Sequence, residues 1–302
     1  MSSTSIGYVI SARPRWRRLR WGALLLLAPA LVLMLVFFIV PVFDALYLSL
    51  TNGEFQGAHS RVFDFIGLAN YQHMLHDMFL GNSLLQTAIY VGASAIVGQT
   101  LLGIILALLS EQAWQWLRLS VGSIIVTAWV VPQIVQAVIW SSFSTSGGTL
   151  DLLLGPSRAN TNWLVSAPML IICIANLWRS VALSMLLFGA GLRNISHEVK
   201  EAAQLDGASY WQRLLYVILP IMNPTIVTNF ILVTLANLSD FTLIYALTQG
   251  GPGNATQTLP LYIYEQAFTY YELGYGTAIA VLLIAIGAVA SLIYVRLLRA
   301  EI

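Results

Sequence analysis

Residues 193–220 read RNISHEVKEAAQLDGASYWQRLLYVILP, and this polar stretch lies between two long apolar runs. Its pattern predicts a short helix, a turn and a second, amphipathic helix. Ser196 is suited to cap the first helix, whose body is residues 199–205, and Gly207 permits a sharp reversal of the chain. Pro220 is expected to open the apolar run that follows.

The first of these two helices has an unusually flat face. Ala202 and Ala203 leave room for another backbone to approach, and few charges surround them. Such a helix suits docking into a groove on a partner protein. A loop that lies on lipid headgroups would show the same spacing, so the spacing alone leaves both interpretations open.

On either side of this stretch the chain is built for lipid. Of its 302 residues, 58% are hydrophobic and 9% are charged, against about 25% charged residues in soluble domains. The net charge of +1 excludes a strongly basic nucleic-acid binder. We expect an all-α membrane protein, because a helix of roughly 20 apolar residues crosses the bilayer with its backbone satisfied. Six spans are predicted, at residues 21–43, 84–109, 119–140, 165–192, 221–247 and 277–298.

The basic residues predict the orientation. Six spans place both termini on one side, and eleven basic residues fall there while two fall on the other side, so the richer side is expected to be cytoplasmic. Residues 1–20 form a basic cytoplasmic segment, and residues 21–302 a single six-span domain with the loop 193–220. The first apolar run is too long for a cleaved signal. The cytoplasmic set is Arg13, Arg15, Arg17, Arg18, Arg20, Arg118, Arg193, Lys200, Arg213, Arg296 and Arg299; the outer set is Arg61 and Arg158.

No catalytic or nucleotide-binding motif is present. The chain has no phosphate-binding Gly-x-x-x-x-Gly-Lys-Ser/Thr loop, no Gly-x-Ser-x-Gly elbow and no His-Glu-x-x-His pair. His73, His76 and Asp77 lie together in an outer loop, but no fixed further ligand is evident, so we expect no metal. The single cysteine, Cys173, is interpreted as a buried inert thiol. Any uphill transport therefore needs energy from a partner or an ion gradient.

The loop 193–220 also resembles the EAA loop of binding-protein-dependent ABC importer permeases. The matching residues are Glu201-Ala202-Ala203, Gly207 and Val217-Ile218-Leu219-Pro220, and the fuller string Glu-Ala-Ala-x-x-Asp-Gly-Ala-Ser-x-Trp is similar to the carbohydrate, maltose-type branch. The resemblance extends along nearly the whole chain, through segments 66–71, 162–164, 248–252 and 274–278. Thr242 departs from it, because the family often has Asp there, while this chain has Asp240 two residues earlier.

This resemblance implies a type I ABC importer permease fold with six transmembrane helices. It implies a second permease subunit that is a different homologous chain, two ATPase subunits that hold ATP and Mg, and an extracytoplasmic solute-binding protein or lipoprotein. The chain itself would be non-catalytic and without a cofactor, in a prokaryotic plasma membrane. The implied solute is a sugar, an oligosaccharide or a glycerol-phosphate-type compound. The implied coupling residues are Glu201, Ala202, Ala203, Asp206, Gly207 and Ala208.

Polar side chains inside the predicted spans are candidates for the substrate pathway. A charge in mid-span costs at least about 2.5–3.5 kcal/mol on insertion scales, so such residues face the bundle interior or a water-filled cavity. One interpretation is a sugar site at the midplane. The other is a structural pair, Arg179 with Asp240 or with a carbonyl, or contacts to the second permease. The candidates are Trp178, Arg179, Asn229, Asn237 and Asp240.

Three other functional classes are weighed against an importer permease. An ion-coupled secondary transporter would need its own coupling-ion residues and commonly internal repeats, which the sequence does not show. An intramembrane enzyme would need paired catalytic or metal-binding side chains within spans. A channel or an assembly scaffold would work without ATP. Each is separated from the importer by whether transport depends on a partner ATPase.

Overall fold

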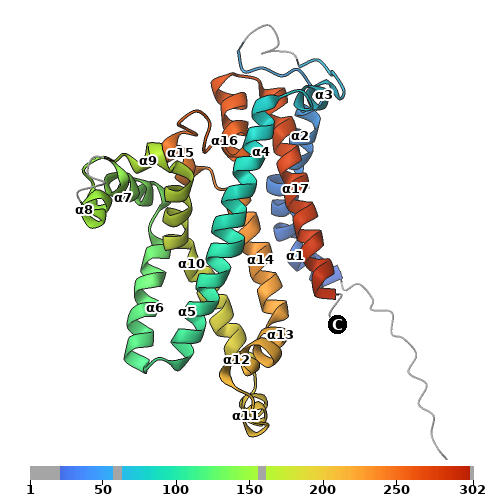
Figure 1. Ribbon diagram of the computed structural model, residues 1–302. Helices are drawn as coiled ribbons and strands as arrows, with labels where there is room; N and C mark the ends of the chain where they lie inside the picture. The colour runs from blue at the N-terminus through green and yellow to red at the C-terminus, as the bar shows by residue number, and fades with distance from the viewer. Residues whose placement is uncertain (1–20, 57–62, 156–160, 300–302) are drawn as a thin grey trace, which may run out of the picture. The chain divides into compact units, whose positions relative to one another are not determined.

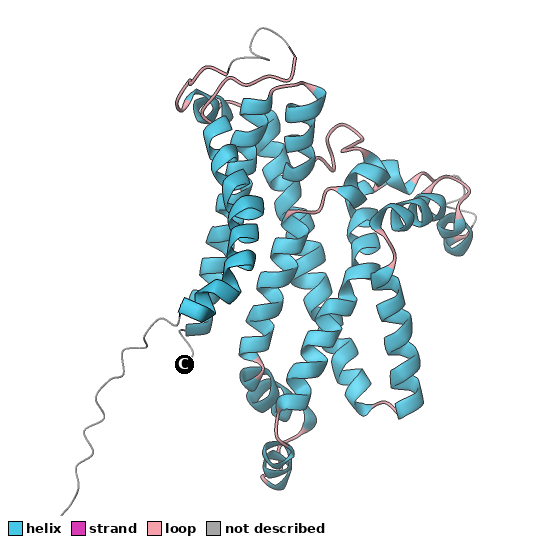
Figure 2. Cartoon of the chain, turned by 180° about the vertical axis from the view of Figure 1, so that it is seen from behind, coloured by secondary structure: helices cyan, strands magenta, loops and turns pink. Residues whose placement is uncertain are grey.

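The computed structural model describes residues 21–56, 63–155 and 161–299, and these residues are almost entirely helical (Figures 1 and 2). The basic segment 1–20, Arg61 and Arg158 lie outside the described residues. The chain divides into two compact units, Met1–Ala45 and Leu46–Ile302. Within the described ranges, four helices are long and apolar enough to span a membrane, and the number rises to six if two sharply bent helix pairs each count as one span. The predicted all-α fold with six spans is consistent with this count.

The first unit is a single apolar helix in its described part. α1 (Trp21–Met34) runs into a π-helical turn, Leu35–Ile39, and then into α2 (Val40–Leu48), which continues past the boundary of the unit. The segment Leu26–Leu48 is 23 residues long, which is enough to cross the bilayer. The helix continues five residues beyond the predicted end at residue 43.

The second span is a 35-residue helix, Met78–Gln112, which is longer at both ends than predicted. It comprises α4 (Met78–Tyr90), a π-helical segment Val91–Gln99 and α5 (Thr100–Gln112). Asp77 caps its first turn, since its carboxylate accepts hydrogen bonds from the Phe79 and Leu80 amides at 2.9 and 3.2 Å. The preceding loop contains the short α3 (Ala69–Met74).

The third predicted span, residues 119–140, is wrong as one straight helix. α6 (Gln115–Val130) and α7 (Gln133–Ser144) meet at 103°. Val131 is out of the helical conformation, with φ −59° and ψ 126°, because the Pro132 ring excludes it from the α region. The chain therefore turns by about a right angle between α6 and α7. The short α8 (Thr149–Leu154) follows α7.

The fourth span agrees with prediction in the main. α10 (Pro168–Asn194) is a continuous 27-residue helix, preceded by the four-residue α9 (Trp163–Ser166). Pro168 stands in the first turn of α10, where its missing amide hydrogen costs nothing. The predicted start at residue 165 is three residues too early.

The fifth predicted span, residues 221–247, is broken twice. The arm Tyr210–Ile221, formed by α12 (Tyr210–Arg213), π-helical Leu214–Ile218 and α13 (Leu219–Ile221), meets α14 (Asn223–Leu238) at 68°. Pro220 therefore lies within the first arm and does not open the span, and Pro224 stands in the first turn of α14. α14 ends at Leu238, and α15 (Thr242–Thr248) begins after a three-residue break.

The last span follows a folded outer segment. α16 (Leu259–Tyr264) and π-helical Glu265–Thr269 precede α17 (Leu273–Arg299), which is 27 residues long. The sequence predicted a loop at residues 248–276, so α16 is an addition. Its first amide, Leu259 N, donates to the Thr87 hydroxyl at 2.8 Å and thereby ties it to α4.

The core of the second unit lies where α4, α10, α14, α15 and α16 meet. Its buried side chains include Tyr90, Ile172, Val233, Leu243 and Leu261. α5 also packs closely on α10, because a Cβ added at Gly103 would lie 2.4 Å from the Ser184 Cβ atom. Figure 1 shows α5, α10 and α14 running side by side.

Candidate functional site

The loop 193–220 forms the helix–turn–helix that its pattern predicts. α11 (His197–Leu205) follows Ser196, which occupies the N-cap position without a side-chain hydrogen bond. Gly207 has φ +79°, a left-handed conformation that glycine adopts without strain. Ser209 and Gln212 then form a reciprocal capping box that starts α12. The turn between the helices is thus fixed by local chemistry.

The side chains predicted to couple to a partner lie on a protruding helix. Glu201 and Ala202 are exposed, and so are Asp206 and Gly207, whereas Ala203 and Ala208 are half-buried. Glu201 pairs with His197 one turn earlier, at 2.9 Å. α11 lies at the extreme end of the second unit (Figure 1). The alanine face that the sequence predicted is therefore open to a partner at Ala202 and partly covered at Ala203.

Lys200 anchors α11 to the rest of the unit, and the sequence did not predict this role. Its ammonium group pairs with the Glu111 carboxylate at the end of α5 and donates to the Leu192 carbonyl, 3.1 Å away, near the end of α10. Gln112 adds a second tie by donating to the Tyr210 hydroxyl at 3.2 Å. No local pattern links positions 111 and 200, so only the tertiary fold reveals the pair.

A cleft of about 380 Å³ lies between α11, α12 and the end of α5. Lys200, Ala203, Tyr210 and Arg213 line it together with Glu111. The cleft separates the flat helix from the bundle. Across this cleft, Lys200 ties α11 to α5 and α10, and Gln112 ties α5 to α12.

A buried polar cluster occupies the interior of the bundle, around Asn237 of α14. The Asn237 side-chain oxygen accepts from Asn176 at 2.5 Å and from Gln99 at 3.4 Å, and its amide donates to the Val233 carbonyl at 2.7 Å. Asn176 also donates to Ser94 at 2.6 Å. Three spans thus meet through side-chain amides at this point, which the sequence predicted only for Asn237.

Asp240 lies in the break between α14 and α15 and is buried. Its carboxylate accepts from the Tyr90 hydroxyl at 2.5 Å and from the Gln133 amide at 3.1 Å. Tyr90 comes from α4 and Gln133 from the first turn of α7. The break between α14 and α15 therefore places the Asp240 carboxylate in contact with two other helices, α4 and α7.

Arg179 lies beside this region, but it forms no ion pair with Asp240, the partner that the sequence suggested. Its Nε atom donates to the Val131 carbonyl at 3.2 Å, at the bend between α6 and α7. Asp240 remains near enough to interact with its charge. Of the two structural alternatives for Arg179, the Arg–carbonyl contact is the one present.

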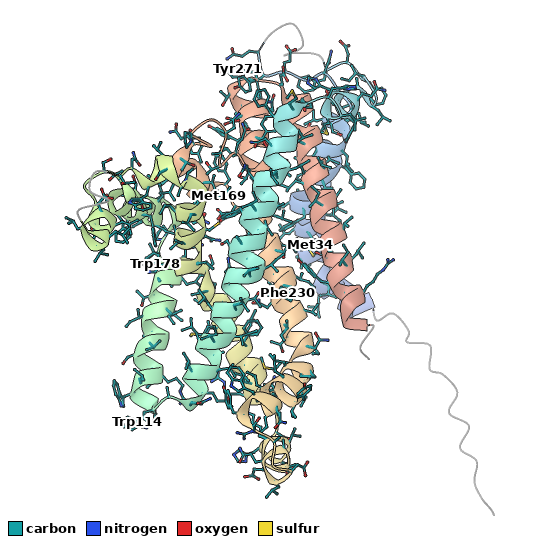
Figure 3. All side chains as sticks on the ribbon, viewed as in Figure 1. Met34, Trp114, Met169, Trp178, Phe230 and Tyr271 are labelled. Atoms are coloured by element: carbon teal, nitrogen blue, oxygen red, sulfur yellow. The ribbon has the colours of Figure 1, made fainter. Side chains whose placement is uncertain are left out.

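The other two candidates lie at the margins of the cluster. Trp178 is 40% exposed and meets Trp140 edge to face, with ring centroids 6.5 Å apart; Figure 3 shows it on α10 beside the upper end of α6. Asn229 is buried and donates to Thr100 at 3.2 Å. It precedes Asn237 by two turns, or about 12 Å of helix, so it does not join the cluster.

Gln99, Asn176 and Gln133 were not predicted, although their signal was available. Each is an amide within or beside an apolar run, where an unpaired polar group is costly. The same criterion that selected Asn237 selects them as well. The predicted set was restricted to charged residues, one tryptophan and the polar residues of the fifth span, so these three amides were left out.

At the opposite end, Asp77 gathers hydrogen bonds from three elements. Besides the two helix amides, it accepts from Tyr262, at 2.6 Å, and from Tyr275. Burial raises the pKa of Asp77, but the hydrogen bonds from both tyrosines and both amides outweigh it, so the net pKa is lowered. Burial likewise raises the pKa of Glu265 above its ordinary value. Among the described residues, no group of three or more His, Cys, Asp or Glu side chains could hold a metal.

Comparison with known proteins gives a consistent result. A family model described as a binding-protein-dependent transport system inner membrane component matches residues 99–301. The chain is 32% identical over 309 residues to the sulfoquinovosyl glycerol transport system permease protein SmoG of Agrobacterium fabrum, with 95% of each chain covered. It is 31% identical to the trehalose/maltose transport system permease protein MalF of Thermococcus litoralis, covering 96% of this chain and 97% of that one.

A solved structure shares the fold. One chain in the crystal structure of a bacterial ABC transporter involved in alginate import superposes with a TM-score of 0.78 at 19% identity, covering 93% of this chain and 96% of that one. The long apolar helices of the described residues are those of a multi-pass membrane protein. The chain belongs to the family of binding-protein-dependent transport system inner membrane components and is a permease of an ABC importer.

Proposed function

We propose that this permease carries a carbohydrate, which is a sugar, an oligosaccharide or a glycerol-phosphate-type solute. The relatives named above belong to transport systems for sulfoquinovosyl glycerol and for trehalose and maltose. Sugars need many hydrogen bonds and an apolar ring face, and sites for such ligands combine a few convergent polar groups with aromatic walls. Asn237, Asp240 and Arg179 supply the polar groups, and Trp178 supplies a half-exposed ring.

The proposed substrate site is thus reduced from five predicted residues to four. Asn237 and Asp240 lie three residues apart on either side of the end of α14, and each accepts a hydrogen bond from the second span, from Gln99 and Tyr90 respectively. Asn229 is assigned to helix packing against Thr100 instead. Amides that pair with one another can exchange those partners for solute hydroxyls, so the cluster suits transient binding.

The proposed coupling element is α11 with its turn. Glu201 would anchor it at a groove of the ATPase, Ala202 and Ala203 would pack closely there, and Gly207 would make the turn, with Asp206 and Ala208 beside it. Movement of the ATPases would then rock the spans between inward-open and outward-open arrangements. In this scheme both termini and α11 face the cytoplasm, which agrees with the basic residues near α11.

The observation that most directly supports this scheme is that one bent helix, residues 210–238, joins the Gly207 turn to Asn237 and ends two residues before Asp240. α12 begins just after Gly207, and the bent helix that follows ends at Leu238, between Asn237 and Asp240. A displacement of α11 that passes through the Gly207 turn would therefore reach the polar cluster along this bent helix. The geometry suits ATP-driven alternating access.

The partners follow from this scheme. We assign a second permease subunit of different sequence, two ATPase subunits that bind ATP and Mg and perform the hydrolysis, and an extracytoplasmic solute-binding protein or lipoprotein. The chain itself contacts membrane lipid and no nucleic acid. It acts in the plasma membrane of a prokaryote.

The test is the ATPase activity of the purified complex in lipid, with and without its binding protein, across a panel of sugars. Stimulation by one loaded binding protein, and its loss in Asn237→Ala and Asp240→Ala but not in Asn229→Ala, is the expected result. If a sugar stimulates equally in all three variants, the site assignment falls. If no sugar stimulates while another solute does, the carbohydrate assignment falls.

A further inference from the structure

A groove on the side of the bundle is used neither by the solute site nor by the coupling turn. It lies between α5, α6 and α10 near the end that carries α11, and its volume is about 230 Å³. Leu119, Met185 and Leu186 form apolar walls, and Leu119 and Leu186 are 60% and 41% exposed. The groove therefore opens toward the apolar surroundings of the helices.

Two arginines line the groove at its basic end. Arg118 stands on the first turn of α6, and Arg193 near the last turn of α10. The Arg193 Nε atom donates to the Gly189 carbonyl at 3.0 Å, and one of its terminal nitrogens lies 3.7 Å from the position of a Cβ atom at Gly189. This guanidinium is thus held over the groove. Glu111 also lines it, but its charge is balanced by Lys200.

The floor and the mouth of the groove fit the same kind of ligand. Gly122 leaves open space where a side chain would start, so a narrow chain can lie against the helix backbone. Trp114, 77% exposed, stands at the α5–α6 turn (Figure 3), and Trp116, 63% exposed, follows in the first turn of α6. Exposed tryptophans of this kind mark the headgroup level of a membrane.

We infer that this groove binds an anionic glycerophospholipid, with its phosphate between Arg118 and Arg193 and the start of one acyl chain over Gly122. Basic pockets between membrane helices bind anionic lipid headgroups. The volume is below the roughly 300–1,000 Å³ of sites that enclose a whole drug-sized ligand, so only part of the lipid enters. The rest of the chain lies along exposed Leu119 and Leu186. This inference does not depend on which solute is transported.

The experiment titrates the delipidated, purified complex with phosphatidylglycerol or phosphatidylcholine and counts retained lipids by native mass spectrometry. Each arginine is expected to contribute roughly a five-fold preference for the anionic lipid. We expect Arg118→Gln combined with Arg193→Gln to remove most of that preference. Arg296→Gln, an exposed arginine on α17, is the matched control and should keep it.

Gly122→Leu provides a second, steric test because it fills the floor and leaves both arginines intact. It should reduce retention of phosphatidylglycerol, and open space at Gly122 makes the substitution compatible with folding. The inference is overturned if the wild-type complex shows no anionic preference, as it would if the second permease subunit covered the groove. It is also overturned if the double arginine variant keeps the preference.

Discussion

At the scale of single residues, the Asp77 carboxylate accepts four hydrogen bonds. It caps α4 and accepts hydrogen bonds from Tyr262 and Tyr275, so it joins α4, α16 and α17. An Asp before an apolar run is a signal for the cap, but the sequence analysis considered Asp77 only beside His73 and His76; the tyrosine partners, 185 and 198 residues away, depend on the tertiary fold. His73 instead meets the Tyr275 ring, with centroids 4.6 Å apart.

The lowered pKa of Asp77 predicts a pH-dependent contribution to stability. A carboxyl whose folded pKa is lowered stabilises the fold at pH values above its ordinary 3.8, and this stabilisation is lost as the pH falls through the lowered value. Asp77→Asn keeps the cap but loses the charge. Thermal unfolding in detergent should show wild type more stable between about pH 5 and 7, with the gap closing in acid. A gap that does not change with pH would contradict the assignment.

Gly207 gives a second residue-scale prediction. Its φ of +79° costs an L-residue about 1–2 kcal/mol, and more if the side chain is β-branched. Gly207→Val should leave the protein inserted but lower the ATPase stimulation by the loaded binding protein. Gly207→Asn is the matched control, because Asn tolerates this conformation. Equal stimulation in both variants would show that the turn geometry does not matter.

At the scale of elements, the sequence predicted which segments are apolar but not how they bend. Six apolar runs are present, yet those around Pro132 and Met222 bend by 103° and 68°. An apolar run indicates that a segment lies in lipid. A bend, in contrast, depends on which backbone hydrogen bonds are lost at one or two residues. The polar residues that gather at these bends, such as Gln133 and Asp240, were for the same reason only partly predictable.

The pair Lys200–Glu111 is expected to transmit movement between α11 and α5. Both side chains are partly exposed, so the pair adds only about 0–1 kcal/mol to stability. Lys200→Met and Glu111→Gln should therefore leave the melting temperature nearly unchanged and lower the solute transported per ATP hydrolysed. The exchange Lys200→Glu with Glu111→Lys should restore part of it. Restoration is incomplete because Glu cannot donate to the Leu192 carbonyl. No restoration at all would argue against the pair.

The contact of α5 with α10 predicts an asymmetry between two glycines. Gly103→Ala places a methyl group against Ser184, where its Cβ atom would lie at 2.4 Å, and such overpacking costs about 1–3 kcal/mol. Gly81→Ala meets nothing within 4 Å and adds helix propensity. Thermal unfolding of the two variants should move in opposite directions. Destabilisation of both to the same extent would contradict the close packing.

At the scale of the whole molecule, the permease connects a buried polar cluster to an exposed helix through one bent segment. The sequence identified both ends of this connection, because Asn237 and Asp240 are costly in an apolar run and residues 201–208 match a family loop. The path between them required the fold. The central claim is that α11 faces the cytoplasm and contacts the ATPase.

The measurement that tests this claim most directly is cysteine cross-linking of α11 to the ATPase in assembled membranes. The single native cysteine, Cys173, is buried, so we expect little cross-linking from the wild-type chain. A cysteine at exposed Ala202 should cross-link to the ATPase subunit, and one at Leu75, 83% exposed at the opposite end, should not. Cross-linking from Leu75 and none from Ala202 would contradict both the orientation and the role of α11.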